Sequence, residues 1–185
     1  MDDSSKINFI AFRHIINNMH IRKATPDDLK VIMSIYKAAQ KFMIESGNPT
    51  QWGHSYPEKK LIADDIDSEV CHLICDESGV CAVFALFEKA EPTYKNIEDG
   101  EWLNDEAYVT IHRIASNGRT PGVFKCAVTY CKSISDNIRI DTHKNNSIMQ
   151  NQIEKNGFKR CGIIHVRDGS ERIAYQWSRQ NNPSP

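Results

Sequence analysis

The segment "NGRTPGVFK", residues 117–125, contains a predicted helix start whose residue types suit the binding of an anion. Thr120 is expected to cap this helix, and Pro121 is expected to be its first residue. A second helix should begin in the same way at "TPDDLK", residues 25–30, where two aspartates bring negative charge to the positive end of the helix dipole. The turn after Thr120 has no acid and is preceded by Arg119. This contrast indicates a helix end that is open to an external anion.

A phosphate group would fit the vacancy at this helix start. The backbone amides of Gly122, Val123 and Phe124 are the expected free donors of the first turn, because proline has no amide hydrogen. Glycine allows a ligand to approach the backbone closely, and the helix end carries roughly half a unit of positive charge. The amides of Gly118 and Arg119 are candidates to complete the same nest. The alternative interpretation is a plain surface helix start followed by a glycine-containing turn.

Apolar spacing and breaker residues predict one domain of α/β (α+β) class, with a mixed, mostly antiparallel sheet of about seven strands flanked by about four helices. The predicted elements are strands at 20–24, 107–116, 137–142, 159–166 and 171–178, a two-stranded hairpin at 69–89, and helices at 25–47, 58–68, 120–135 and 145–158. The strand–helix–strand unit at 107–142 requires a parallel pair. Ligands collect at the carboxyl end of such a strand, where the next helix begins.

Composition and charge exclude several classes of function. The chain has 185 residues, a formal net charge of -1 and a sequence pI of about 6.6. This near-neutral balance argues against nucleic acid as a partner, and no apolar run is long enough to span a bilayer. We expect a domain at 19–180 between an N-terminal extension at 1–18 and a tail at 181–185, with Met19 as an alternative start. The acidic beginning is not typical of a signal peptide, so a cytoplasmic location is expected.

The six cysteines do not have the spacing of a zinc site. They lack the paired C-x-x-C pattern, and most have apolar neighbours, as in "GVCAVFALF". We therefore expect reduced, buried thiols that behave as small apolar side chains, and no metal. The cysteines are Cys71, Cys75, Cys81, Cys126, Cys131 and Cys161.

Two segments of the chain resemble the GNAT-type N-acetyltransferase superfamily, in particular an uncharacterised bacterial-type subset. The family has an R/Q-x-x-G-x-G/A signature at a strand-to-helix turn, which Arg119 and Gly122 match. It also has an Asn that opens a helix and a closing G-F before a strand, which Asn146, Gly157 and Phe158 match. The resemblance covers nearly the whole chain after residue 19. It implies the GNAT fold, with acetyl-CoA as co-substrate and its pyrophosphate held by the amides of the helix start.

Two residues depart from the family pattern. Phe124 stands where the signature has a second small residue, and its bulk would crowd the phosphates unless the helix start turns it away. Ile153 stands where the family often has a tyrosine that acts as general acid toward the CoA sulfur, so another group or water must serve. The resemblance also implies that backbone groups near Ile114 and Ala115 hold the pantetheine arm and polarise the thioester carbonyl.

Three side chains are candidates for the proton transfer that acetylation of an amine requires, namely His112, Asp141 and His143. Asp141 and His143 are two residues apart on or just past a strand, so their side chains could share a face, roughly 7 Å apart. A histidine titrates in the range that neutral-pH proton transfer needs. Each candidate also has an ordinary interpretation. His112 could be a half-buried strand residue, Asp141 a cap or turn partner, and His143 a solvated loop residue.

The long connection at 88–106 is the predicted border of the acceptor site. It combines aromatic residues, Tyr94 and Trp102, with seven acids, a composition that suits a cationic amine. The alternative is a solvated charged loop. The expected acceptor is a small-molecule or peptide amine, and a homodimer is a possible assembly. The seven acids are Glu88, Glu91, Glu98, Asp99, Glu101, Asp105 and Glu106.

The sequence therefore predicts an enzyme that transfers the acetyl group of acetyl-CoA directly to an amine. The alternative is a non-catalytic acyl-CoA-binding domain of the same fold, which the departures at Phe124 and Ile153 suggest. A nucleotide-dependent kinase or a dehydrogenase is disfavoured, because the chain lacks both G-x-x-x-x-G-K-[ST] and G-x-G-x-x-G.

Overall fold

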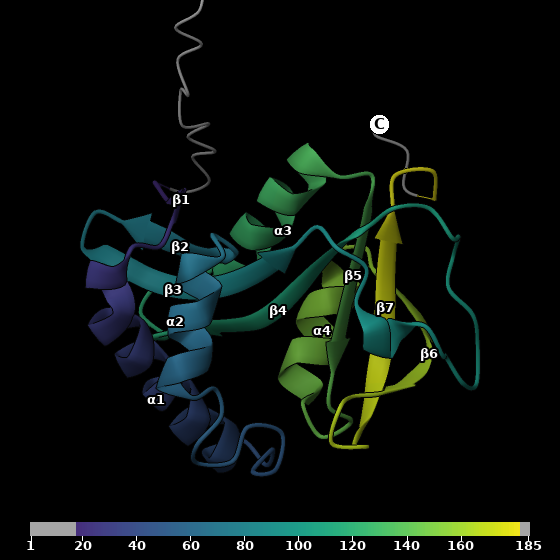
Figure 1. The fold of residues 1–185 in the computed structure, drawn as a ribbon, viewed down its shortest axis with the longest axis horizontal. Coiled ribbons are helices and arrows are strands. Elements are labelled where there is room, and N and C mark those ends of the chain that lie inside the picture. The colour runs from purple at the N-terminus through teal and green to yellow at the C-terminus, as the bar shows by residue number, and fades with distance from the viewer. Residues whose placement is uncertain (1–17, 182–185) are drawn as a thin grey trace, which may run out of the picture.

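A computed structural model of the chain describes residues 18–181 and is drawn in Figure 1. Its seven-stranded sheet has the order β1-β2-β3-β4-β5-β7-β6. The strands are β1 (His20–Lys23), β2 (Cys71–Asp76), β3 (Gly79–Phe87), β4 (Val109–Ser116), β5 (Asn137–Thr142), β6 (Lys159–His165) and β7 (Glu171–Ser178). The helices are α1 (Leu29–Glu45), α2 (Lys59–Asp67), α3 (Val123–Ile134) and α4 (Ser147–Lys155), with short 3-10 turns η1 (Pro26–Asp28) and η2 (Pro92–Tyr94). The predicted fold class is confirmed. The predicted extension (1–18) and tail (181–185) lie outside the described residues, apart from residues 18 and 181.

The connection β4–α3–β5 is the predicted strand–helix–strand unit. β4 and β5 pair in parallel, whereas the other five neighbouring pairs of strands are antiparallel. The parallel ladder is short, with Val109 opposite Ile138 and Thr110 opposite Arg139. Beyond these two pairs the strands diverge, as Figure 1 shows. The sheet therefore opens on the carboxyl side of β4, where the sequence predicts ligand binding.

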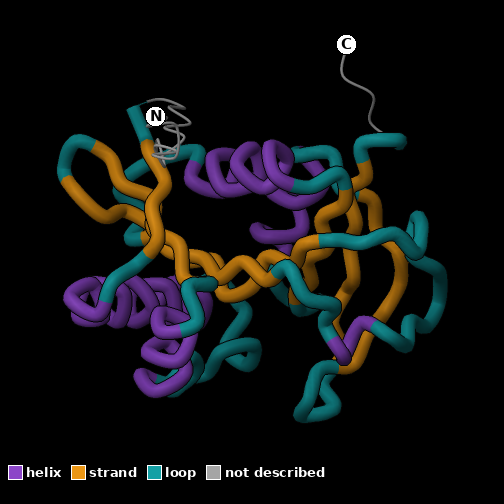
Figure 2. Tube along the Cα trace, turned by 45° about the horizontal axis from the view of Figure 1, so that its top comes forward, coloured by secondary structure: helices purple, strands orange, loops and turns teal. Residues whose placement is uncertain are grey.

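Helices cover both faces of the sheet, as Figure 2 shows. On one face, side chains of α1 and α2, such as Ile32 and Ile62, pack with Val83 of β3. On the other face, Phe124 of α3 packs with the neighbouring β3 residue Phe84. Successive residues of a strand point to opposite faces, so the continuous apolar run of β3 is buried on both sides. This confirms the prediction that β3 is central and covered on both faces.

The segment before α1 begins as predicted at Thr25, although its first turn is a 3-10 turn. Thr25 and Asp28 form a capping box, in which the Thr25 amide donates to the Asp28 carboxylate over 2.8 Å. Asp28 also receives two hydrogen bonds of 2.7 Å from Arg22 of β1. This guanidinium, together with the Thr25 donors, holds the pKa of Asp28 well below its usual range. The acid that serves the helix start thus also joins it to the first strand.

The six cysteines are buried and free of disulfide bonds, in agreement with the sequence. Among residues 18–181, no group of three or more His, Cys, Asp or Glu side chains is arranged to hold a metal ion. No helix in this part of the chain is long and apolar enough to cross a membrane.

The long connection between β3 and β4 folds back over the outer edge of β6. Glu98 and Ile163 exchange two backbone hydrogen bonds of 2.8 Å and form an isolated antiparallel bridge. The backbones approach closely because the two residues beside this bridge, Gly100 and Gly162, have no side chains. A Cβ atom on Gly100 would lie 2.0 Å from the carbonyl oxygen of Cys161. We call residues 97–100 the strap.

Replacing Gly100 with Ala should destabilise the protein by about 3 kcal/mol or more, because the added methyl group overlaps a backbone oxygen that cannot yield without moving the strap. Urea unfolding measures the change. Gly169→Ala is the matched control, because Gly169 has a left-handed φ of 81° but nothing within 4 Å of an added Cβ. That control should lose only about 1 kcal/mol, the cost of the backbone conformation. Equal losses in the two variants would show that the strap does not hold the connection in place.

Candidate active site

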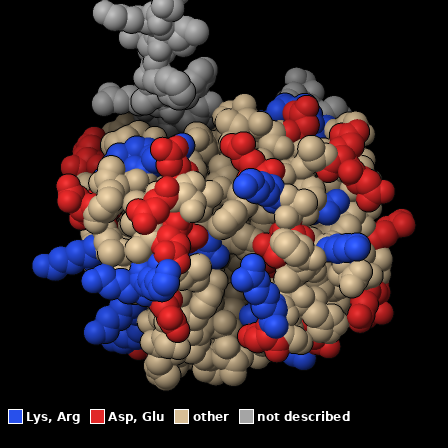
Figure 3. Space-filling model, viewed as in Figure 1, with Lys and Arg blue, Asp and Glu red and all other residues tan. Residues whose placement is uncertain are grey.

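A cavity of about 1060 Å³ lies where β4 and β5 diverge. Its walls come from β4, the start of α3, the end of β5, the start of α4, the α1–α2 segment, the β3–β4 connection and the β6–β7 turn. The longest continuous run of lining residues is that from Ile111 to Gly118, along β4 and past its end. In Figure 3 the acidic and basic side chains are interspersed over the visible face, without an extended surface of one sign. A cavity of this size and mixed lining suits a small-molecule ligand.

A β-bulge on β4 shapes the floor of this cavity. Val83 of β3 lies opposite Ala115, and Ala85 lies opposite His112, so two β4 residues oppose one residue of β3. Arg113, one of the two, has a left-handed φ of 51°. Bulges of this kind redirect side chains and release backbone groups from the ladder. The other bulge residue, Ile114, lines the cavity with Ala115, so both predicted pantetheine contacts border the expected ligand space.

Two contacts hold the bulge in place. The Arg113 guanidinium makes hydrogen bonds of 3.0 and 2.9 Å to the Asp65 carboxylate of α2, and both side chains are largely buried. The hydroxyl of Tyr36 on α1 donates to the Arg113 carbonyl oxygen over 2.9 Å. Burial raises the pKa of Asp65, and the adjacent guanidinium opposes that rise. The bulge is therefore anchored to both helices of that face.

The start of α3 lies later than predicted. Its N-cap is Gly122, with a left-handed φ of 83°, and the first helical residue is Val123 rather than Pro121. Thr120 does not cap the helix, because its hydroxyl donates to the Asp76 carboxylate of β2. Glycine adopts the left-handed conformation without strain, which explains the new boundary. Gly122, Val123 and Phe124 line the cavity, so the first-turn amides border the ligand space as expected.

Arg119 and its neighbours differ from the prediction. The Arg119 guanidinium donates to the Asp76 carboxylate over 2.8 Å and does not line the cavity. The amides of Gly118 and Arg119 already have acceptors, the Ser116 hydroxyl at 3.3 Å and the Asn117 side-chain oxygen at 3.0 Å. Asp76 is thus the acidic partner of Arg119 that residues 117–125 do not contain. The contacts with Thr120 and Arg119 lower the pKa of Asp76. Neither of these two amides is a vacant donor, although Gly118 lines the cavity.

Phe124 does not crowd this helix start with its ring. Its side chain is only 6% exposed and belongs to the core cluster between the sheet and α3. The start of the helix therefore turns the bulky residue inward, which removes the steric concern raised by the sequence. Ile153 is fully buried in the same core cluster, so its position on α4 supplies no acid to the cavity.

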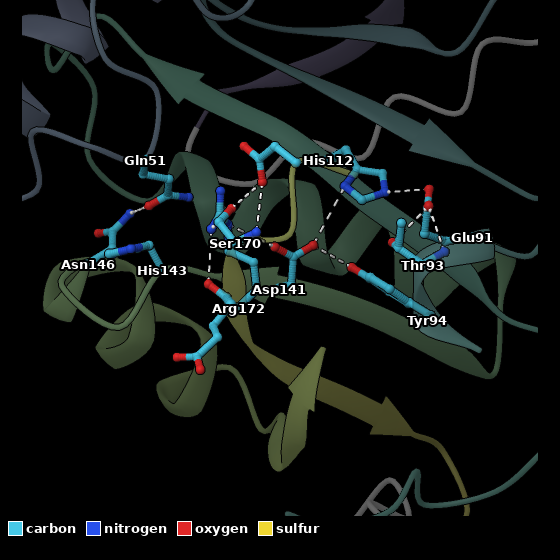
Figure 4. A network of polar contacts seen from close by, with 12 residues as sticks. Gln51, Glu91, Thr93, Tyr94, His112, Asp141, His143, Asn146, Ser170 and Arg172 are labelled. Atoms are coloured by element: carbon cyan, nitrogen blue, oxygen red, sulfur yellow. Dashed lines mark hydrogen bonds and ion pairs between the residues drawn. The ribbon is translucent and has the colours of Figure 1, made fainter. Parts of the chain in front are cut away.

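His112 and Asp141 come together inside the cavity, in the network drawn in Figure 4. His112 Nδ1 lies 3.9 Å from Asp141 Oδ2, and His112 Nε2 lies 3.4 Å from Glu91 Oε2. Asp141 Oδ2 also accepts a hydrogen bond of 2.7 Å from the hydroxyl of buried Tyr94. His112 Nε2 is buried and has no well-aligned hydrogen bond. The imidazole thus lies between two carboxylates, each within 4 Å of one ring nitrogen.

His143 does not join this pair. It follows the end of β5 and is absent from the cavity lining. Its Nδ1 accepts a hydrogen bond of 3.2 Å from the Asn145 amide. Burial lowers the pKa of His143, and the charges of Arg172 and Lys144 lower it further. The structure therefore separates the two histidines that the sequence offered.

Glu91 is a cavity residue that the sequence did not single out. Of the seven acids in the connection at 88–106, only Glu91 lines the cavity. Its carboxylate caps η2 by accepting bonds of 3.1 Å from the Thr93 amide and 2.9 Å from the Thr93 hydroxyl. The signal was available in "EPT", where an acid precedes a proline and a threonine, as at a helix start. The predicted acidic border thus reduces to one carboxylate.

The aromatic residues in and just after that connection serve the protein itself rather than a ligand. The Trp102 and Tyr108 rings contact the Arg139 guanidinium, whose carbon lies 3.9 and 4.0 Å from their centroids. The expectation that Trp102 and Tyr94 face an external amine is therefore wrong. Trp102 already contacts an internal cation, and Tyr94 is buried with its hydroxyl on Asp141.

Asn146 caps α4 as predicted and also contacts the α1–α2 segment at one side of the cavity. Its side-chain oxygen accepts a hydrogen bond of 3.1 Å from the Met149 amide, and its Nδ2 donates over 3.0 Å to Gln51. The same Gln51 oxygen accepts a hydrogen bond of 2.8 Å from the Asn48 side chain. Gln51 was missed by the sequence analysis, because 95 residues separate it from Asn146. This contact joins the α1–α2 segment to α4 at one side of the cavity (Figure 4).

The environment of Glu91 makes an acid-dependent contribution to stability. The adjacent His112 ring and the Thr93 donors lower the pKa of Glu91 from 4.5 to about 2. A lowered pKa stabilises the folded state when the pH is above the ordinary pKa of the carboxyl group. This contribution is lost as the pH falls from 4.5 toward 2. The melting-temperature difference between wild type and Glu91→Gln should therefore narrow across that window. Glu88→Gln, an exposed change in the same connection, should show no such narrowing, and a constant gap for Glu91→Gln would contradict this account.

Comparisons with known proteins give matches among solved structures. No protein-family model matches the sequence, and no curated protein matches it. A GNAT-family acetyltransferase from Streptococcus agalactiae is 29% identical, with a TM-score of 0.81 over 89% of this chain and 97% of that one. A phosphinothricin acetyltransferase of the GNAT superfamily from Sinorhizobium meliloti, solved with acetyl-CoA, is 14% identical, with a TM-score of 0.59 over 91% and 93%. A putative acetyltransferase from Salmonella typhimurium, also solved with acetyl-CoA, is 11% identical, with a TM-score of 0.59 over 91% and 98%.

Proposed function

Because this chain belongs to the GNAT N-acetyltransferase superfamily, we propose that it transfers the acetyl group of acetyl-CoA directly to a primary amine. The proposal rests on two groups that line the cavity where β4 and β5 diverge. The cavity contains an open helix start, at Gly122, and a histidine between two carboxylates, at His112. The first suits the pyrophosphate of the co-substrate, and the second suits the proton transfer that an ammonium acceptor requires.

Acetyl-CoA would lie along β4. Its pyrophosphate would accept hydrogen bonds from the amides of Gly122, Val123 and Phe124 at the positive end of α3. The pantetheine arm would then run past Ala115 and Ile114, and the thioester would reach the bulge next to His112. Backbone groups that the bulge releases would stabilise the negative charge that develops on the carbonyl oxygen.

His112 would act as the general base. The ammonium group gives a proton to the imidazole, and its nitrogen then attacks the thioester carbon, forming the C–N bond as the C–S bond breaks. The nitrogen loses two protons in all, of which one ends on the thiolate of CoA and the other passes to solvent. Glu91 and Asp141 would stabilise the imidazolium electrostatically, at 3.4 and 3.9 Å from its nitrogens. Because Ile153 offers no acid, the imidazolium or a water molecule would protonate the sulfur.

CoA release measures this activity. The purified protein should release free thiol from acetyl-CoA with a panel of primary amines, at a rate that depends on the amine and saturates with it. The acetylated amine, identified by mass spectrometry, distinguishes transfer from hydrolysis. Binding of acetyl-CoA without thiol release with any amine would favour the alternative, a non-catalytic acyl-CoA-binding domain, and would overturn the proposal.

A further inference from the structure

Apolar side chains that face solvent are concentrated at the cavity. Four large hydrophobic residues are exposed in the described part of the chain, and three of them, Phe42, Tyr56 and Ile148, line the cavity. Phe42 is 54% exposed and Tyr56 is 38% exposed. Exposed apolar side chains grouped at a cavity mark a binding surface more often than scattered ones do. The fourth, Ile134 at the end of α3, is not among the lining residues.

Three aromatic residues of α1 and the segment after it, Phe42, Trp52 and Tyr56, line the cavity, and we call them the aromatic wall. The Trp52 and Tyr56 rings lie 6.2 Å apart between centroids. Trp52 also meets the edge of buried Tyr36, at 5.7 Å and an interplanar angle of 71°. Such packing fixes the indole, so the wall presents a preformed apolar surface.

One contact joins the wall to the β4 bulge that follows His112. The link is Tyr36, which contacts Trp52 and donates its hydroxyl to the carbonyl oxygen of Arg113, the residue after His112. The pyrophosphate site at Gly122 is nine residues further along the chain, on the far side of the bulge. A group bound on the wall would therefore lie toward the bulge, where the thioester is proposed to meet the acceptor, rather than toward the phosphate end of CoA.

The charges of the cavity limit what else the acceptor carries. Four carboxylates and three guanidinium groups line it. Asp65 pairs with Arg113, and Arg172 lies 3.9 Å from Asp141. Arg172 also donates to the Ser170 hydroxyl and to the Glu171 carbonyl, at 2.8 and 3.0 Å. The four carboxylates are Asp65, Glu91, Asp141 and Asp168, and the third guanidinium is that of Arg167, next to Asp168 in the turn at the rim.

We infer that the acceptor is a small monoamine that carries an aryl or branched alkyl group and no carboxylate, with the apolar group bound on the aromatic wall. This inference rests on the proposed function. Glu91 and Asp141 attract an ammonium group at the His112 end of the cavity. An additional carboxylate would meet these two acids, while Arg113 and Arg172 already have carboxylate neighbours in Asp65 and Asp141. The apolar group removes exposed aromatic surface from water, which favours binding.

Three amines that share the ethylamine unit test the inference, namely 2-phenylethylamine, phenylalanine and 2-aminoethanol. We expect kcat/KM for CoA release to be at least about tenfold higher with 2-phenylethylamine than with either of the others, as burial of one aromatic ring predicts. Trp52→Ala should raise KM for 2-phenylethylamine about tenfold and leave KM for 2-aminoethanol nearly unchanged. Ile134→Ala is the matched control, an exposed apolar residue that does not line the cavity, and it should change neither value.

The outcomes separate this inference from the proposed function. Similar kcat/KM values for the three amines would leave acetyl transfer standing and overturn the apolar acceptor. If acetyl-CoA binds but no amine releases CoA, the proposed function falls, and amine binding followed by intrinsic tryptophan fluorescence becomes the readout. In that titration the wall is supported if 2-phenylethylamine binds at least about tenfold more tightly than 2-aminoethanol, and overturned if the two bind equally.

Discussion

Gly122→Asp should weaken acetyl-CoA binding more than tenfold, because it places a carboxylate where the α3 amides are proposed to hold the pyrophosphate. At a few ångströms from a phosphate, a like charge at a partly exposed site is worth about 1 to 4 kcal/mol. Isothermal titration with acetyl-CoA measures the change. Titration with a phosphate-free pantetheine thioester should show a much smaller effect.

The control for this variant is Gly122→Asn. Asn and Asp have nearly the same shape, and both tolerate the left-handed φ of 83° better than other side chains. Any loss due to backbone strain or bulk should therefore appear in both variants, and only the aspartate should add charge repulsion. If the two variants bind acetyl-CoA equally well, the phosphate site is elsewhere.

His112→Gln should lower kcat/KM for acetyl transfer by about 10²- to 10⁴-fold, the range over which general base catalysis contributes. Glutamine approximates the size of the ring but cannot accept the ammonium proton. The decrease should shrink as the pH rises, because more of the amine is then already deprotonated. The rate as a function of pH, together with a melting curve to show that the variant is folded, measures this effect.

His143→Gln is the matched control for that experiment. His143 lies just past β5 but outside the cavity lining, with its Nδ1 on the Asn145 amide. We expect less than a threefold change in kcat/KM for this variant, as for a substitution away from the reacting atoms. A large effect at His143 with none at His112 would reverse the assignment of the general base.

Local sequence patterns predicted the elements that carry the cavity. The doubly apolar run of β3 indicated a central strand, and the Asn146 side chain indicated the start of α4. The strand–helix–strand unit that ends at Thr142 required the parallel pair. Each of these features depends on residues a few positions apart, and neighbouring side chains decide such features largely on their own.

Contacts between distant residues were not predictable in the same way. Asp76 takes the Thr120 hydroxyl and the Arg119 guanidinium, but 44 and 43 residues separate it from them. The local sequence therefore suggested an external anion for Arg119, whereas Asp76 of β2 is already its partner. Similarly, the sequence shows that Trp102 is aromatic but not that its neighbour is Arg139. Only the folded chain decides which cation an aromatic ring meets.

The choice of Glu91 among seven acids shows the same limit. Its place in the cavity depends on how the connection at 88–106 is held, and the strap on β6 is one of the contacts that hold it. The glycines that permit this close approach, Gly100 and Gly162, are 62 residues apart in the chain. Composition indicated an acidic border, and only the folded arrangement selects the single carboxylate that faces His112.

The strap also bears on how copies of this protein can assemble. β6 is the last strand of the sheet, and an uncovered last strand can recruit a strand from another molecule and so lead to aggregation. Here the strap occupies both backbone hydrogen-bonding groups of Ile163, at the middle of that strand. A second copy cannot extend the sheet across β6 without first displacing the strap. If a homodimer forms, contact on the β6 side must therefore use side-chain surfaces rather than a continuous intermolecular sheet.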